Sequence, residues 1–169
     1  MEQRLPLAKE SGMSRVEVLR SIVDRILEDV RDPENRRCGF VHLYGVSLVA
    51  TWLARRRGEN EDLAASAGML HDIGTYETGD PTDHAARSAN RARAILQATS
   101  LYAEHEIRTI CTAIGHHSDK KSTHDPFSEL LKDADVLQHI LYNPALPPLP
   151  NDAPRREDCL RMLSPQTGR

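Results

Sequence analysis

The sequence is poor in residue types on which several classes of protein depend. Aromatic residues make up 4% of the chain, too few to suggest the base-stacking surfaces of proteins that bind single-stranded nucleic acid. Its cysteines (Cys38, Cys111 and Cys159) are odd in number and form no CxxC pair, which fits a reducing compartment and argues against a disulfide scaffold. No apolar run approaches the roughly 20 residues that a membrane-spanning helix needs.

Charge of neither sign dominates the chain. There are 22 Lys and Arg residues against 25 Asp and Glu residues, which gives a formal net charge of -3. This balance offers no basic surface for nucleic acid or for an anionic membrane, so neither is expected as a partner. The first residues, MEQRLPLAKESGM, lack the apolar stretch of a signal peptide, and we therefore expect a cytoplasmic protein.

The hydrophobic pattern follows the period of helices. The chain has 169 residues, which suits a single compact domain. No segment shows the alternation of a half-buried strand, so we expect an all-α fold with about six or seven helices. Residues 1–13 are expected to be a flexible start, and residues 143–169 a Pro-rich loop with a tail that holds one short helix. The other expected helices span residues 14–30, 39–57, 60–71, 83–96, 103–116 and 125–142, with loops at 74–82 and 118–124.

Histidine is plentiful, with eight residues, and the positions of some indicate a metal site. His71 and Asp72 are adjacent at the end of an apolar helical run, where both side chains can reach one ion although they could not share a face within the helix. His42 and Asp135 lie within separate predicted helices. Such a mixed nitrogen and oxygen set suits Fe, Mn, Co, Ni or Zn, and leaves coordination positions open to water, as hydrolysis requires.

The order His42, His71-Asp72, Asp135 resembles the H…HD…D signature of the HD-domain superfamily. Residues 68–74 (GMLHDIG) are similar to the "LHDIG" segment of that family, and residues 133–137 (DADVL) to its "DADxL" segment. The second Asp of that segment is the ligand, so the resemblance selects Asp135 over Asp133. It covers roughly residues 15–142 and implies a helical HD-domain bundle over residues 14–142 that acts as a metal-dependent phosphohydrolase.

Two further segments resemble elements that recruit a second metal in HD proteins. Residues 83–88 (DHAARS) are similar to an "H…S" element and contribute His84. Residues 113–118 (AIGHHS) are similar to an "AIxxHS" element that aligns His117 with the extra ligand, and the neighbouring His116 is the alternative. We therefore expect one or two divalent transition-metal ions, and favour a dinuclear site. Fe or Mn is favoured over Co, Ni, Zn or Mg.

The resemblance implies a small phosphate monoester or diester, often of a nucleotide, as the substrate. Asp72 and His71 are expected to support a metal-activated water that attacks the phosphorus. Lys120 and Lys121 follow the His117 segment and could neutralise phosphate charge, as could Arg87.

Two other functions are compatible with the same residues. One is a regulatory HD module that binds a nucleotide or metal without turnover, and the other, less favoured, is a di-iron oxygenase. His105, His124 and His139 are interpreted as non-ligands, although His139 lies one turn beyond Asp135 and could support it. The sequence is also compatible with a homodimer that forms through a helix face.

Overall fold

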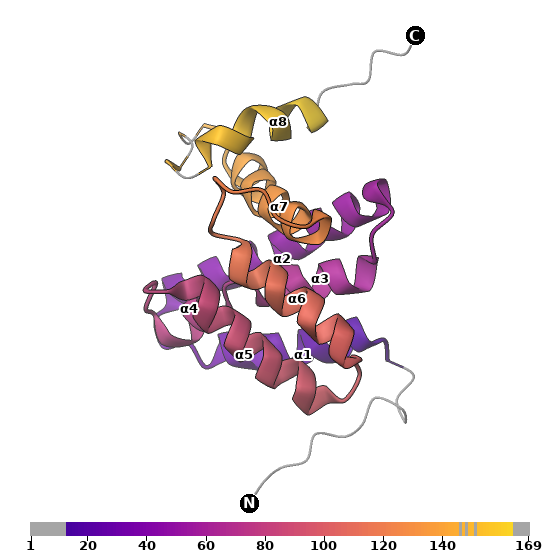
Figure 1. Cartoon of the computed structure of the whole chain (residues 1–169). Helices are drawn as coiled ribbons and strands as arrows, with labels where there is room; N and C mark the ends of the chain where they lie inside the picture. The colour runs from indigo at the N-terminus through magenta and orange to yellow at the C-terminus, as the bar shows by residue number, and fades with distance from the viewer. Residues whose placement is uncertain (1–12, 146, 148, 151, 164–169) are drawn as a thin grey trace, which may run out of the picture.

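A computed structural model describes residues 13–145, 147, 149–150 and 152–163, and within them helix is the only regular secondary structure (Figure 1). The prediction of an all-α fold is confirmed. The predicted flexible start falls almost wholly on residues 1–12, and the end of the predicted tail on residues 164–169, both outside the described residues. The helices are α1 (Arg15–Glu28), α2 (Pro33–Arg57), α3 (Glu61–Leu70), α4 (Ile73–Thr78), α5 (His84–Thr99), α6 (Glu104–His116), α7 (Pro126–Tyr142) and α8 (Ala153–Leu163).

Several helices begin at capping residues. Ser14 caps α1 by accepting a hydrogen bond from the Glu17 amide at 3.2 Å, and Asp125 caps α7 ahead of a proline at the first turn. The second helix begins at Pro33, whereas the sequence pattern placed a break there and the helix start near residue 39. Asp32 accepts a hydrogen bond from the Asn35 amide at 2.7 Å, and proline tolerates the first helical turn, so the Asp-Pro pair starts the helix.

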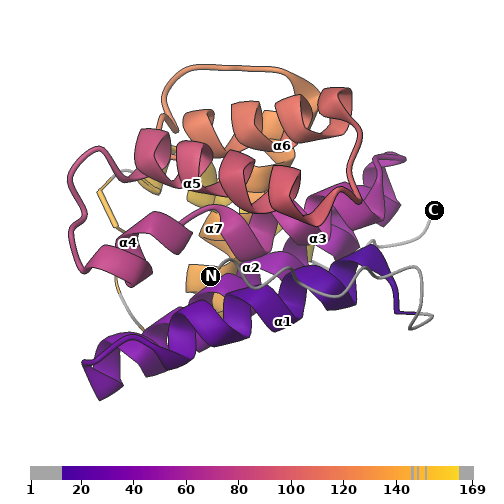
Figure 2. The same ribbon diagram turned by 90° about the horizontal axis from the view of Figure 1, so that it is seen from below.

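Helix α3 forms the centre of the bundle. It contacts α1, α2, α5, α6 and α7, and its residues 63–70 are all buried. Figure 2 shows α1 along one side of the bundle and α5 and α6 side by side on the other. The small side chains of α3 allow neighbouring helices to pack closely against it on several sides. The His71-Asp72 pair that follows α3 therefore lies in the interior of the bundle.

Residues 73–78, which lie mostly in the predicted loop, form the short helix α4. The carbonyl of Asp72 accepts hydrogen bonds from the Thr75 amide at 3.0 Å and the Tyr76 amide at 3.3 Å, which start the helical turn. Gly79 ends it with a positive φ of 72°. Helix α4 therefore follows α3 at once and keeps the intervening His71-Asp72 turn short.

Helix α8 packs on α7 at one end of the molecule (Figure 1). Arg155 forms ion pairs with Glu129 and, at 2.9 Å, with Asp133, and Cys159 is buried. The C-terminal segment is thus held against α7 by both charge and apolar contact.

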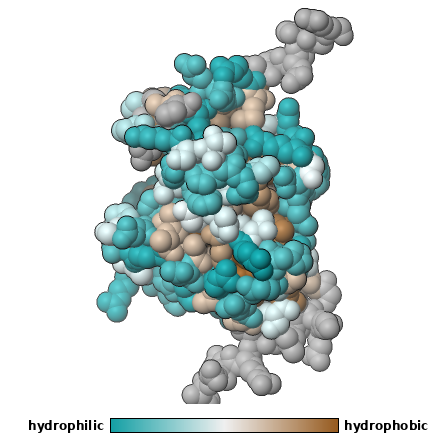
Figure 3. Space-filling model, in the orientation of Figure 1, coloured by the Kyte–Doolittle hydropathy of each residue, from teal (hydrophilic) through white to brown (hydrophobic). Residues whose placement is uncertain are grey.

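The face drawn in Figure 3 is mostly hydrophilic, with smaller hydrophobic areas between the polar ones. Among the helices of the described residues, none has the length and apolar character that crossing a bilayer demands.

Candidate metal centre

Histidine and aspartate side chains from several helices lie close together inside the bundle. His42 comes from the middle of α2 and Asp135 from the middle of α7, while His71 and Asp72 occupy the break between α3 and α4. Asp72 has φ -120° and ψ 15°, outside helical values, and makes no capping hydrogen bond with its side chain. This break turns adjacent side chains toward the same space, which a continuous helix would not do.

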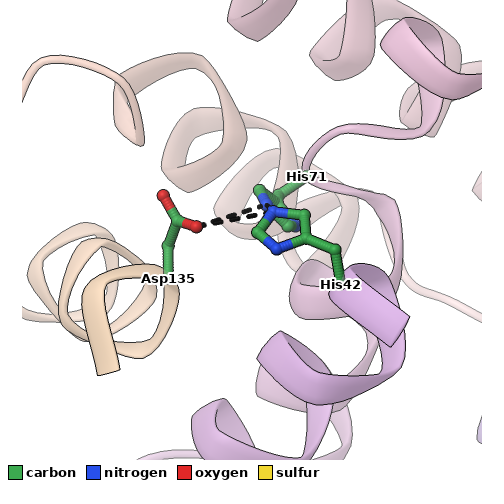
Figure 4. A group of neighbouring side chains, drawn as sticks. All are labelled: His42, His71 and Asp135. Carbon is green, nitrogen blue, oxygen red and sulfur yellow. Dashed lines mark hydrogen bonds and ion pairs between the residues drawn. The ribbon is translucent and has the colours of Figure 1, made fainter. Parts of the chain in front are cut away.

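One group consists of His42, His71 and Asp135, whose ligand atoms all lie within 4.8 Å of one another (Figure 4). The two histidine Nε2 atoms are 3.0 Å apart. Asp135 Oδ1 lies 3.5 Å from Nε2 of His42 and 3.8 Å from Nε2 of His71. A nitrogen and oxygen set of this kind matches the donors that divalent transition metals accept.

A second group consists of His71, Asp72 and His117, with His84 at its edge. Asp72 Oδ1 lies 3.4 Å from Nε2 of His117 and 3.9 Å from Nε2 of His84. The other oxygen, Oδ2, lies 3.6 Å from Nε2 of both His42 and His71. Asp72 therefore stands between the two groups, with one oxygen toward each.

Three of the histidines are fixed through their Nδ1 atoms. Gln138 Oε1 lies 2.9 Å from Nδ1 of His42, and the carbonyl oxygen of Gly68 lies 2.8 Å from Nδ1 of His71. The carbonyl oxygen of Ile114 lies 2.7 Å from Nδ1 of His117. Because each acceptor places a proton on Nδ1, each ring presents Nε2 to the cluster with a free lone pair, which is the form that binds a metal.

Two carboxylate oxygens of the cluster lack the partners that buried polar atoms normally have. Asp72 Oδ1 and Asp135 Oδ1 are buried and accept no hydrogen bond from the described residues. Buried polar atoms are normally satisfied, and here the nearest groups are imidazole nitrogens that also point lone pairs inward. Cations held by the two groups would satisfy these oxygens. The donor set therefore fits a divalent cation.

The pKa values of the three histidines reflect both their burial and the negative charge of the cluster. Burial lowers the pKa of His71 to about 4, which keeps its ring neutral. Burial also lowers the pKa of His42 and His117, but attraction to the nearby carboxylates of Asp72 and Asp135 outweighs it, so the net shift of each pKa is upward. The negative charge of these carboxylates would attract a metal cation as it attracts a proton, so metal binding to these rings would compete with their protonation.

Burial likewise raises the pKa of Asp72 and Asp135, yet both values end well below their ordinary range. Nearby imidazoles lower the pKa of Asp72, and Lys120, His71 and His42 lower that of Asp135. Both carboxylates are therefore ionised and available as ligands.

The sequence matches a known family over the segment that builds this cluster. The family model for the HD domain matches residues 39–140, which is more than half of the chain. The chain belongs to the HD-domain family. HD domains bind divalent metals and are commonly metal-dependent phosphohydrolases. The search for related chains gave no significant match among curated proteins or among solved structures.

Some residues predicted for the HD site lie elsewhere. His116 approaches Ser128 Oγ at 3.3 Å and stacks on His124 with ring centroids 3.8 Å apart, so the structure brings His117 and not His116 to the cluster. Adjacent residues of a helix point in different directions, which separates the pair. Arg87 is bound to Asp80 and neighbouring loop atoms.

The two predicted lysines also differ from each other. A pocket opens at the cluster, and Lys121 is exposed and is not among the residues that line it. Lys120 is buried, with Nζ 2.5 Å from Asp135 Oδ2 and 3.0 Å from Asp152 Oδ1. Its charge is thus shared by two carboxylates of the protein, which leaves less of it for a phosphate.

The HD site also includes residues that the sequence did not single out as part of it. Gln138 lies one turn after Asp135 and fixes His42, a position that helical spacing could have suggested. Asp152 lies beyond the family match, after a Pro-rich stretch, and no motif marks it. Its burial and contacts become visible only when α8 is placed on α7.

Proposed function

We propose that this HD-domain protein is a phosphohydrolase that cleaves a phosphate ester of a small, nucleotide-like molecule with the help of divalent metal. The observation that supports the proposal most is the pair of buried, unpaired carboxylate oxygens on Asp72 and Asp135, which face imidazole Nε2 atoms. Such an arrangement is costly for a protein unless a cation binds it.

The residues divide into two ligand groups around Asp72. His42, His71, Asp72 and Asp135 would hold one ion, and Asp72, His84 and His117 would hold a second. Bound divalent ions supply a Lewis acid that polarises a phosphoryl oxygen and lowers the pKa of an attacking water. The protein contributes fixed ring orientations, two ionised carboxylates and a pocket that admits the substrate.

The pocket supports a substrate with one phosphate group and an organic part. Its volume is about 580 Å³, which suits a molecule of nucleotide size. The pocket is lined by all the candidate ligands except the fully buried His71, and by the apolar or aromatic side chains of Val41, Tyr76, Tyr142 and Leu149. Lys120 alone supplies a permanent positive charge among the lining residues, and that charge is engaged. A chain of phosphates would therefore find no further basic side chain among the lining residues that the structure describes.

A phosphate-release screen tests the proposal directly. Metal-free protein would be reloaded with Mn, Fe, Co, Ni, Zn or Mg and offered mononucleotides, dinucleotides and nucleoside triphosphates. We expect release from one group of monophosphate esters or diesters and little from triphosphates. Metal binding without release from any ester, under any of these ions, would refute hydrolysis and favour a regulatory module.

The second ligand group gives a separate prediction. His84→Ala and His117→Ala should each lower the metal content from about two ions per chain toward one, because each removes an imidazole next to Asp72 Oδ1 and leaves His42, His71 and Asp135 in place. Elemental analysis would measure the content. His105→Ala, an exposed position on α6, is the matched control and should keep the wild-type value. Unchanged content in both variants would contradict a dinuclear site.

A further inference from the structure

Asp152 places a buried carboxylate from the C-terminal segment beside the metal centre. It lies just before α8, outside the residues that the HD-domain family matches, and is only 4% exposed. Both of its oxygens are engaged: Oδ1 lies 3.0 Å from Nζ of Lys120, and Oδ2 lies 2.9 Å from Nδ1 of His139. A carboxylate is buried in this way only where its partners stabilise the charge.

Through Lys120, Asp152 is connected to the candidate metal ligand Asp135. Lys120 Nζ also lies 2.5 Å from Asp135 Oδ2, so one ammonium group joins the two carboxylates. Because Oδ2 of Asp135 is occupied, the other oxygen, Oδ1, is the one that faces His42 and His71. Lys120 thereby determines which oxygen of Asp135 is presented to the cluster.

Through His139, Asp152 contacts a side chain that lines the pocket. With Nδ1 directed at Asp152, the ring stacks on His42 at a centroid distance of 5.2 Å and an interplanar angle of 11°. Its Nε2 atom lies 3.8 Å from Asp135 Oδ1, and the side chain is 35% exposed among the residues that line the pocket. Asp152 therefore fixes a ring whose free edge lies where a substrate would meet the ligands.

Contacts of the nearby Arg155, outside the pocket, hold Asp152 in position. Arg155, one turn further on, pairs with Glu129 and Asp133 on α7 and approaches the Lys120 carbonyl oxygen at 3.4 Å. These contacts dock α8 without entering the pocket, since Arg155 is not among the lining residues.

We propose that Asp152 is a positioning residue of this site, which orients the ligand Asp135 through Lys120 and presents His139 to the phosphate of the substrate. The C-terminal segment is thus part of the functional unit, in addition to the matched HD domain. The inference rests on the proposed metal site, but not on turnover, because both of its consequences concern binding.

Calorimetry with metal-free protein would test the proposal, first with Mn²⁺ alone and then with inorganic phosphate added to the Mn²⁺-loaded protein. Asp152→Asn keeps the side-chain volume and should weaken Mn²⁺ binding about tenfold, the lower end of what lost support for a ligand costs. It should weaken phosphate binding as well. Asp152→Glu should recover part of each loss. Asp158→Asn, an exposed carboxylate of α8, is the matched control and should bind both like the wild type.

Double variants separate positioning from mere folding. Lys120→Met should weaken Mn²⁺ binding, and adding Asp152→Asn to it should weaken that binding no further. His139→Gln should weaken phosphate binding while sparing Mn²⁺, and again Asp152→Asn should add nothing to the phosphate effect.

Three outcomes would overturn the proposal. These are wild-type affinities in Asp152→Asn, additive losses in the double variants, and an equal loss in Asp158→Asn. Circular dichroism of each metal-free variant would show that the bundle is intact. Because these readouts require no hydrolysis, a protein that binds metal and phosphate without turnover would count against the proposed function and leave this inference standing.

Discussion

Replacing Asp72 by alanine should abolish both metal binding and phosphohydrolase activity while leaving the fold intact. Asp72 faces both ligand groups with separate oxygens, Oδ1 toward His117 and Oδ2 toward His42 and His71. Its loss therefore affects both ions at once, unlike the loss of a ligand that serves one group. We expect the metal content to fall to near zero and turnover to fall on the order of 10³-fold, or about 4 kcal/mol of transition-state stabilisation.

The structural reason for an intact fold is that Asp72 makes no capping hydrogen bond to α4 with its side chain. Far-ultraviolet circular dichroism of the metal-free protein should therefore be unchanged, and elemental analysis with phosphate release would give the two functional readouts. Asp80→Ala changes an exposed carboxylate after α4 that pairs with Arg87, and should keep metal and activity. Undiminished turnover in Asp72→Ala would remove the basis of the proposed site.

The central ligands could be predicted because their chemistry is encoded locally. A helix of small and apolar residues that ends in His71-Asp72 can be recognised from the sequence alone, and so can the segment around Asp135. The structure brings these residues together with His42, His84 and His117. What spacing could not decide was the choice between His116 and His117, because the two are adjacent at the end of a predicted helix and only packing shows which one faces inward.

Other features depended on contacts between distant segments. Lys120 was predicted to bind phosphate because it follows the His117 segment, but in three dimensions its charge lies between Asp135 and Asp152. Asp152 carries no local signal, because its importance arises from the packing of α8 on α7. The start of α2 at Pro33 was missed for a different reason: an Asp-Pro pair that can end one helix can also cap the next, and the sequence pattern alone favours neither.

Substituting alanine for Gly68 should cause a large loss of stability, because the two central helices touch at this position. A Cβ atom there would lie 2.5 Å from Cα of Ser47 and 2.6 Å from its backbone nitrogen. Both are backbone atoms of α2 and cannot move aside as a flexible side chain could, so α3 would have to shift. Overpacking of this kind costs about 2–3 kcal/mol, which in a domain of this size lowers the melting temperature by roughly 5–10 °C.

The same substitution should also weaken the metal site, because the carbonyl oxygen of Gly68 accepts the hydrogen bond from Nδ1 of His71. Thermal unfolding with and without Mn²⁺ would separate the two effects: a packing defect lowers both melting temperatures, and a displaced His71 additionally reduces the stabilisation that the metal provides. Gly115→Ala in α6 is the matched control, since a Cβ there meets no atom within 4 Å and should gain up to about 1 kcal/mol of helix propensity. If Gly68→Ala were as stable as this control, the close contact of α2 and α3 would not be what fixes His71 in the centre of the bundle.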